Sequence, residues 1–186
     1  MEIKGTAVKS TQEFVKENYP DRFDEWISSF PETVKTFFNI GILAGNWYPL
    51  KEAVIIPTQK AGELFYDGNI KKAAFDIGKD SAIRALKGVY KIFVRIASVD
   101  FVLKRIKSIF STYYSTGKFD MTFRSDNKVV FVATGFTEDE KLIFDRIAGW
   151  IEGIFVVISN KPFSVTYTCP EANDNYLSAE FTALWK

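Results

Sequence analysis

The 186-residue sequence contains no histidine. This absence excludes Ser-His and Cys-His catalytic pairs, zinc sites with histidine ligands and histidine-ligated haem. It also removes the side chain that most often acts as a general base near neutral pH. We therefore expect a protein that is not an enzyme and that uses no metal and no cofactor.

Cysteine is almost absent as well, since Cys169 is the only one. One cysteine cannot form an internal disulfide, and the first residues lack the apolar core of a signal peptide. Both observations favour a reducing, cytoplasmic location. Long apolar runs are missing too: the longest, 129–133 and 154–158, are far shorter than the roughly 20 residues of a membrane span. We therefore expect no membrane-spanning segment.

Charge of one sign is not in excess, because 24 basic residues face 23 acidic residues and the net charge is +1. This balance provides no overall field that would attract nucleic acid, so we expect no nucleic-acid partner. The short basic runs at 71–72 and 104–107 are interpreted as solvated helix faces.

Aromatic residues, in contrast, are abundant at 16%, mostly because there are 18 phenylalanines. So much aromatic volume indicates either a thick core or an internal cavity with an aromatic lining. The chain shows no internal repeat, low-complexity tract or long linker. Its length suits a single domain over residues 1–186.

Helical signals dominate the first 114 residues, after a short strand expected at 2–8. A capping-box pattern, Ser10-Thr11-Gln12-Glu13, predicts that the first helix begins there. Asp21 and Pro31 are placed to begin two more helices. Further helices are expected at 52–65, with a break or kink at Pro57, and at 70–87, 89–96 and 99–114.

After residue 117 the hydrophobic period changes from helical spacing to two. Strands are predicted at 118–125 and 129–133, joined as a hairpin. A second capping box, Thr137-Glu138-Asp139-Glu140, opens a helix, and two further alternating segments at 163–169 and 176–185 are strands. The predicted class is α+β: a mainly antiparallel sheet covered on one face by a helical layer, with the C-terminal order strand, strand, helix, strand, strand.

Two local features around the last helix allow a structural and a functional interpretation. Gly149 and Gly153 lie one helical turn apart, and together they cost about 2 kcal/mol relative to alanines. Either another backbone approaches closely there, or the missing side chains leave room for a ligand.

Cys169 lies on the apolar face of its strand, which predicts an inert thiol with a raised pKa. It could instead line a pocket.

The C-terminal pattern resembles a known superfamily. Gly149-Trp150-Ile151-Glu152-Gly153, then Cys169, then Asn173-Asp174 and the segment 176–185 are similar to the end of 4-vinyl-reductase domains. That superfamily also includes haem–nitric-oxide/oxygen-binding domains and the small subunits of the TRAPP vesicle-tethering complex. The segments 3–8 and 47–50 resemble an uncharacterised bacterial family that is common in myxobacteria.

The resemblance implies a small-molecule-binding or assembly module with a cavity between the helical layer and the sheet, often as a dimer. The sequence departs from it in three places. Leu177 stands near the position of a second cysteine, Asn173 replaces the usual glycine of the turn, and the proximal histidine and Tyr-x-Ser-x-Arg motif of the haem-binding members are missing.

Our first functional hypothesis is a non-enzymatic, sensor-like regulatory domain that binds an apolar small molecule or lipid without haem. The candidate ligand-binding residues are large side chains on the helices before the hairpin and on the last helix and strands. They are Phe93, Phe101, Tyr113, Tyr114, Trp150, Tyr167 and Cys169. The competing interpretation is that each is a core residue, since aromatic stripes at helical spacing usually are.

The alternative is a protein-interaction module that acts as a homodimer or as a subunit of a complex. It depends on the aromatics of the early helices, which could form an exposed patch. These are Phe23, Trp26, Phe30, Phe37 and Phe38. Acidic residues give little support to an enzyme: the run 138–140 is explained by helix capping, and Asp80 is expected to be a solvated single acid.

Overall fold

The computed structural model describes residues 1–87, 99–159, 163–169 and 176–185. The N-terminal part is mainly helical, with one two-stranded antiparallel ribbon formed by β1 and β2. Its elements are β1 (Glu2–Lys4), α1 (Gly5–Asn18), a 3-10 turn (Pro20–Arg22), α2 (Phe23–Ser28), α3 (Glu32–Ile40), β2 (Trp47–Pro49), a π-helical turn (Lys51–Ile55), α4 (Ile56–Phe65) and α5 (Ile70–Lys87).

The C-terminal part contains the main sheet. Its elements are α7 (Val99–Leu103), α8 (Ile106–Tyr113), β3 (Lys118–Arg124), β4 (Lys128–Phe136), a 3-10 turn (Glu138–Glu140), α9 (Ile143–Ser159), β5 (Phe163–Thr168) and β6 (Leu177–Trp185). The strand order is β3-β4-β6-β5, and all three pairings are antiparallel.

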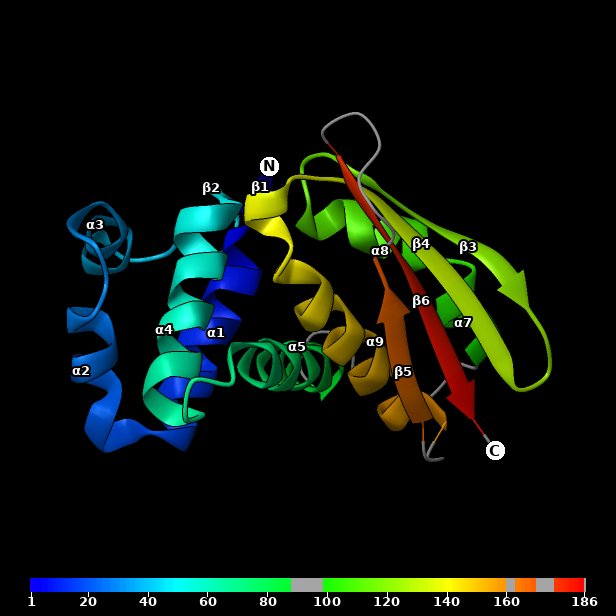
Figure 1. Ribbon diagram of the computed structural model, residues 1–186, viewed down its shortest axis with the longest axis horizontal. Coiled ribbons are helices and arrows are strands. Elements are labelled where there is room, and N and C mark those ends of the chain that lie inside the picture. Colours follow the sequence, from blue (N-terminus) through cyan, green and yellow to red (C-terminus); the bar gives the residue numbers. More distant parts are fainter. Residues whose placement is uncertain (88–98, 160–162, 170–175, 186) are drawn as a thin grey trace.

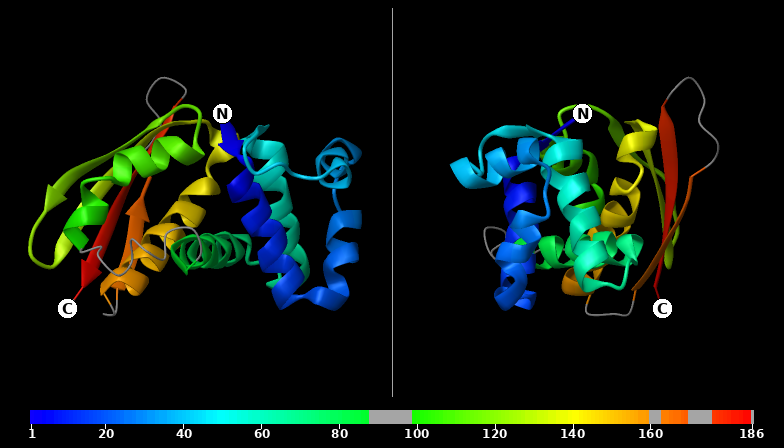
Figure 2. Two further views of the ribbon diagram at one scale, coloured as in Figure 1. Left: turned by 180° about the vertical axis from the view of Figure 1, so that it is seen from behind. Right: turned by 60° about the vertical axis from the view of Figure 1, so that its left-hand side comes forward.

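The sheet forms one end of the molecule, and helices cover one of its faces (Figures 1 and 2). Phe119, Phe131 and Phe181 project from that face and are at most 1% exposed. On β5 the pattern alternates, since Ser164, Thr166 and Thr168 are exposed. Such alternation is expected for a sheet that packs on one face only. The predicted α+β class, the hairpin and the order of the C-terminal elements are confirmed.

The start of α1 differs from the prediction, because the helix begins at Gly5 and not at Ser10. A side chain at position 5 would place its Cβ 2.0 Å from the carbonyl oxygen of Leu43, so only glycine allows the 43–46 turn to approach. The Ser10 and Thr11 hydroxyls donate to the carbonyl oxygen of Ala7, at 2.8 and 3.4 Å. They therefore bond within the helix and do not cap it, and the strand predicted at 2–8 ends at Lys4.

Two other boundaries have clear local causes. The break predicted at Pro57 is present as the π-helical turn Lys51–Ile55, after which Pro57 occupies the first turn of α4, where its missing N–H leaves no hydrogen bond unmade. The helix predicted at 99–114 is divided into α7 and α8, with Arg105 at the N-cap of α8. The expected helix at 89–96, including Phe93, lies outside the described residues.

Buried residues from both parts of the chain form one hydrophobic cluster, which extends from Ile3 to Ala183. Within the described ranges, no helix is both long and apolar enough to cross a membrane.

Candidate functional site

The helices α5 and α9 cross at close range, and three glycines make this possible. A Cβ added at Gly149 would lie 1.9 Å from the carbonyl oxygen of Phe75, and one at Gly153 would lie 2.6 Å from that of Lys79. On α5, a Cβ at Gly78 would lie 2.0 Å from the carbonyl oxygen of Arg146. The first interpretation of Gly149 and Gly153, a close backbone approach, is therefore confirmed. The crossing fixes the α9 side chains relative to α5.

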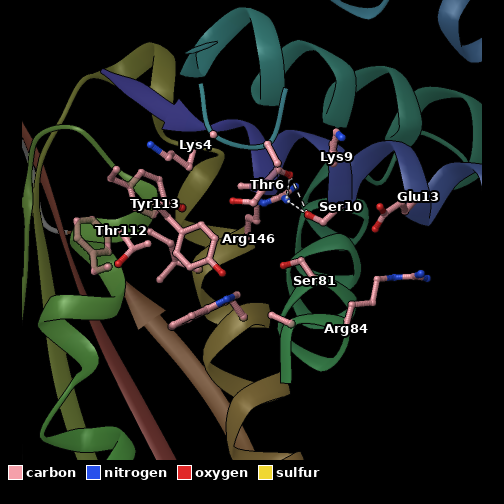
Figure 3. Close-up of a pocket in the computed structure, with 18 of the residues that line it drawn as sticks. Lys4, Thr6, Lys9, Ser10, Glu13, Ser81, Arg84, Thr112, Tyr113 and Arg146 are labelled. Carbon is pink, nitrogen blue, oxygen red and sulfur yellow. Dashed lines mark hydrogen bonds between the residues drawn. The ribbon is translucent and has the colours of Figure 1, made fainter. Parts of the chain in front are cut away.

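Beside this crossing the structure contains a cavity of about 620 Å³, within the range of small-molecule sites. Side chains from four helices converge on it: α1, α5, α8 and α9 (Figure 3). The lining is mostly apolar. It comprises Lys4, Thr6, Ala7, Lys9, Ser10, Glu13, Ala44, Gly45, Ser81, Arg84, Ala85, Phe110, Thr112, Tyr113, Tyr114, Phe119, Arg146, Ile147 and Trp150.

Backbone hydrogen bonds hold two of the cavity walls together. The N–H groups of Gly5 and Thr6 donate to the carbonyl oxygens of Asn46 and Ala44, at 2.8 and 3.2 Å, which seats the 43–46 turn on the start of α1. On the opposite side, Ile3 of β1 pairs with Tyr114, at the end of α8. The cavity is thus bounded by α1 and its flanking turn on one side and by α8 on the other.

Aromatic rings form the apolar wall on the α8 side. The Phe110 ring stacks on those of Tyr114 and Phe119, with centroids 4.4 and 5.3 Å apart. Tyr113 meets Trp150 of α9 edge to face at 6.3 Å. These contacts leave each ring in a defined orientation, so the wall is formed before any ligand arrives.

Arg146 is the most unusual residue of the site, because it is only 4% exposed although it is an arginine. Its guanidinium donates three hydrogen bonds to α1: to Thr11 Oγ1 at 2.9 Å, to the carbonyl oxygen of Ala7 at 3.0 Å and to Ser10 Oγ at 3.1 Å. All three acceptors are neutral. Figure 3 shows the group at the cavity wall, directed towards α1.

Burial changes the acid–base properties of two lining residues. Burial is the main reason that the pKa of Arg146 falls to about 10. It also raises the pKa of Tyr114 to about 12, although the nearby charge of Arg146 acts in the opposite direction. The cavity therefore has a low effective polarity around a group that carries a full charge at neutral pH.

The charged residues nearer to solvent are paired differently. Arg84 of α5 donates to Glu17 at 2.5 and 2.7 Å and also forms an ion pair with Asp80. Asp80 is thus a partner in a network and not the solvated single acid that we expected. Lys4 lies 4.3 Å from the ring centroid of Trp47.

Three of the predicted ligand-binding residues line the cavity: Tyr113, Tyr114 and Trp150. The other described candidates are placed elsewhere. Tyr167 packs on Phe181 at 5.4 Å on the sheet. Cys169 follows β5 and is half-buried, and burial raises the pKa of its thiol as predicted.

Phe101, the remaining described candidate, is half-buried in α7, where its ring lies 3.8 Å below the guanidinium of Arg105. It is not among the lining residues of the part of the chain described here. Phe93 lies outside the described residues.

The sequence prediction missed Arg146, Ser10 and the charged rim. A signal for Arg146 was present: it is three residues after Ile143 and four before Trp150, so it shares the apolar face of α9. A cation on an apolar helix face indicates either a buried partner or a ligand. The role of Ser10 had no such signal, because its partner is 136 positions away in the sequence.

The early aromatics, which supported the interaction hypothesis, fill the interior. Trp26, Phe30 and Phe38 are at most 8% exposed, and the Trp26 indole N–H donates to the carbonyl oxygen of Pro57 at 2.9 Å. Phe23 and Phe37 are partly buried against the same core. The large apolar side chains exposed in this region are instead Ile40 (81%) and Leu43 (62%).

The set of donor atoms around the cavity gives a test of possible cofactors. Among the described residues there is no cluster of histidine, cysteine or acidic side chains that could hold a metal ion. The whole chain lacks histidine, and the phenols of Tyr113 and Tyr114 are the lining groups closest in type to a known haem-iron ligand. A phenol must lose its proton to ligate iron, and the raised pKa of Tyr114 opposes that loss. These residues do not fit a haem iron.

Comparison with known proteins found no matching protein-family model and no matching curated protein. Solved structures of haem–nitric-oxide/oxygen-binding (H-NOX) domains do match. A mutant of the T. tengcongensis H-NOX has a TM-score of 0.73 and 14% identity, with 98% of this chain and 97% of that chain covered. An oxygen complex of an oxygen-binding H-NOX domain related to soluble guanylate cyclases also has a TM-score of 0.73, with 15% identity and 98% and 95% coverage.

A third match is the Fe(II) unliganded form of a mutant H-NOX protein from K. algicida, with a TM-score of 0.72, 9% identity and coverage of 98% and 96%. At such low identity the matches show the fold alone. The chain has the H-NOX fold along nearly its whole length.

Proposed function

We propose that this protein is a sensor-like domain that binds an apolar small molecule in the cavity between α1, α5, α8 and α9, without haem and without catalysis. The observation that carries this proposal is the cavity itself, which has about 620 Å³ of space behind a mostly apolar lining. Small-molecule sites are typically concave and mostly apolar pockets of about this size.

The fold supports the binding of a small molecule, and the donor atoms of the lining support binding without haem. The H-NOX structures that share this fold include an oxygen-binding domain, so the architecture is used elsewhere for a bound small molecule. The histidine-free lining favours a ligand that is held by apolar contact and hydrogen bonding over one held by iron. A regulatory role would follow if the ligand changes how α1 and α8 sit against each other, since both walls border the cavity.

The test is binding of N-phenyl-1-naphthylamine, a neutral apolar dye that fluoresces when it leaves water. We expect saturable binding with a stoichiometry of one dye per chain. Thr112→Phe, which adds a ring at the cavity lining, should weaken it about tenfold or more. Ser111→Phe is the matched control, because Ser111 is its exposed neighbour, does not line the cavity and donates to the same carbonyl oxygen of Ser108.

Native mass spectrometry of the purified protein, repeated after denaturation, provides the second measurement. A small added mass that is lost on denaturation would identify the ligand class. Absence of saturable dye binding, or equal weakening by both phenylalanine variants, would contradict the proposal.

Self-association as a homodimer is our second candidate, and the exposed pair Ile40 and Leu43 favours it. An apolar surface of this kind is buried in many dimers. If the pair forms the interface, Ile40→Lys should convert the dimer to a monomer in light scattering after size exclusion. A wild-type protein that is monomeric at all concentrations would exclude this candidate.

A further inference from the structure

The guanidinium of Arg146 has no carboxylate in direct contact among the described residues, and Asp80, the acid whose charge acts on it, is bonded to Arg84. No acidic group lies within 4.0 Å of its guanidinium in residues 1–87, 99–159, 163–169 or 176–185, and its three hydrogen bonds go to two hydroxyls and one carbonyl. Arg84, which borders the same cavity, has two carboxylates beside it. The buried arginine is therefore the one of the two that lacks a directly paired carboxylate.

A buried cation without an anion is unfavourable, and proteins normally pair such a group. Neutral hydrogen bonds replace part of the lost hydration but not the missing counter-charge. The three bonds also tie α9 to α1, which gives Arg146 a structural role. A neutral residue such as glutamine or methionine could join two helices without the cost of a buried charge, so the structural role does not explain why the residue is cationic.

The other charged residues of the lining are Lys4, Lys9, Glu13 and Arg84, and the charge of Arg84 is offset by Glu17 and Asp80. The rim therefore carries a small excess of positive charge. Figure 3 shows Lys4, Lys9 and Arg84 at the edge of this space, with their charged ends directed away from its centre. Cations at the rim raise the local concentration of anions and assist their entry.

The remainder of the cavity is unsuited to a small inorganic anion. Phe110, Phe119 and Ile147 are at most 7% exposed and form apolar surface beside the guanidinium, with Trp150 next to them. A ligand that fills this space needs an apolar body. To form an ion pair with the guanidinium of Arg146, it also needs one negative charge at its end.

Nη2 of Arg146 already donates both of its hydrogens, to Ala7 and Ser10, and Nη1 donates one to Thr11. A carboxylate suits the remaining Nε and Nη1 hydrogens because a hydrogen bond between two charged groups is stronger than one between neutral groups.

We propose that the cavity selects an apolar monocarboxylate, such as a medium-chain fatty acid, and that its carboxylate forms an ion pair with Arg146 while its chain lies along Phe110, Phe119 and Trp150. This inference rests on the proposed function and adds the ligand class. The pair forms inside the protein, so it is weakly screened by salt compared with a pair at the surface.

The experiment displaces bound N-phenyl-1-naphthylamine with decanoate and with 1-decanol, which has the same chain and no charge. For the wild-type protein we expect decanoate to bind about tenfold or more tightly than decanol, since hydrogen bonds to a charged group are stronger than neutral ones. Moderate salt should change this ratio little. In Arg146→Gln, the affinities for decanoate and decanol, each measured on the variant itself, should become about equal.

Two further variants separate the ion pair from a general effect of positive charge. Lys9→Gln removes a rim cation and should lower decanoate affinity less than threefold. Arg146→Lys keeps the charge but presents it as a compact ammonium on a different stem, so part of the decanoate advantage should remain. If Arg146→Gln does not fold, the wild-type ratio and the lysine variant still decide the question.

Two results would overturn the ion pair and leave the cavity proposal intact: equal affinities for decanoate and decanol in the wild type, or a decanoate advantage that persists in Arg146→Gln. Failure of the dye itself to bind would instead contradict the proposed function. The two failures are therefore distinguishable.

Discussion

Two aromatic clusters of this protein use the same kinds of side chain in different ways. In the α2–α3 cluster, Trp26, Phe30 and Phe38 pack on one another with ring centroids 4.7 to 5.8 Å apart and are at most 8% exposed. At the cavity wall, Tyr113 and Trp150 meet at 6.3 Å and stay half-buried. The first cluster is filled, whereas the second borders open space.

The difference lies in the surroundings and not in the rings. The one polar hydrogen in the α2–α3 cluster, the indole N–H of Trp26, has a partner within the protein at 2.9 Å. The cavity wall instead adjoins the cation of Arg146, which has no anion beside it among the described residues. In this protein, the aromatic cluster that indicates a ligand site is the one beside a charged group without a direct partner of opposite charge.

Replacing one tryptophan of each cluster by alanine should give the largest difference in the free energy of unfolding. Trp26→Ala removes a fully buried side chain and an internal hydrogen bond, so we expect it to lower the free energy of unfolding by about 3–5 kcal/mol. Trp150→Ala, at the cavity wall, should cost about 1 kcal/mol, because its surroundings are already open. Urea unfolding measures both. Equal losses would mean that the cavity wall is packed as tightly as the α2–α3 cluster.

A substitution at the crossing of α5 and α9 should cause the next largest loss of stability, because this close contact sets the position of α9 beside the cavity. Gly149→Ala places a methyl group against the carbonyl oxygen of Phe75, and we expect a loss of about 1–3 kcal/mol. Gly45→Ala is the control, since Gly45 also lines the cavity but a Cβ there meets nothing within 4 Å. Thermal unfolding should show a clear drop for Gly149→Ala and almost none for Gly45→Ala. A harmless Gly149→Ala would contradict the close approach.

Local signals were sufficient to predict much of this fold from the sequence. The helix 70–87 was predicted with the bounds of α5, because the turn at Asp67–Asn69 ends the preceding helix. The capping box of Thr137 and Glu140 forms as predicted, since both partners lie within four residues. The capping box at Ser10 was wrong because distant groups decide that segment: the 43–46 turn sets the start of α1 at Gly5.

The site was predicted only in part for the same reason. The sequence prediction selected Tyr113, Tyr114 and Trp150 as large aromatic side chains on or next to the helices, and all three line the cavity. It could not separate them from Tyr167, which also faces inwards but packs against the sheet. Which inward residues border a cavity depends on how far apart the helices stand, and that distance is set by contacts such as Gly78 with Arg146, remote in the sequence.

The smallest expected effect concerns Tyr114 and appears only at alkaline pH. Its pKa is raised from 10.0 to about 12 in the folded protein, chiefly by burial. The folded state therefore holds this proton more tightly than the unfolded state, so the stabilisation is complete below pH 10 and is lost as the pH rises through about 12. Tyr114→Phe removes this loss, so its melting temperature should decline less steeply than that of the wild type between those pH values.

Tyr176→Phe, at a position 59% exposed, serves as the control and should follow the wild type. A Tyr114→Phe curve parallel to the wild type would mean that water reaches this phenol from the cavity, and the aromatic wall on the α8 side would then be as hydrated as the rim.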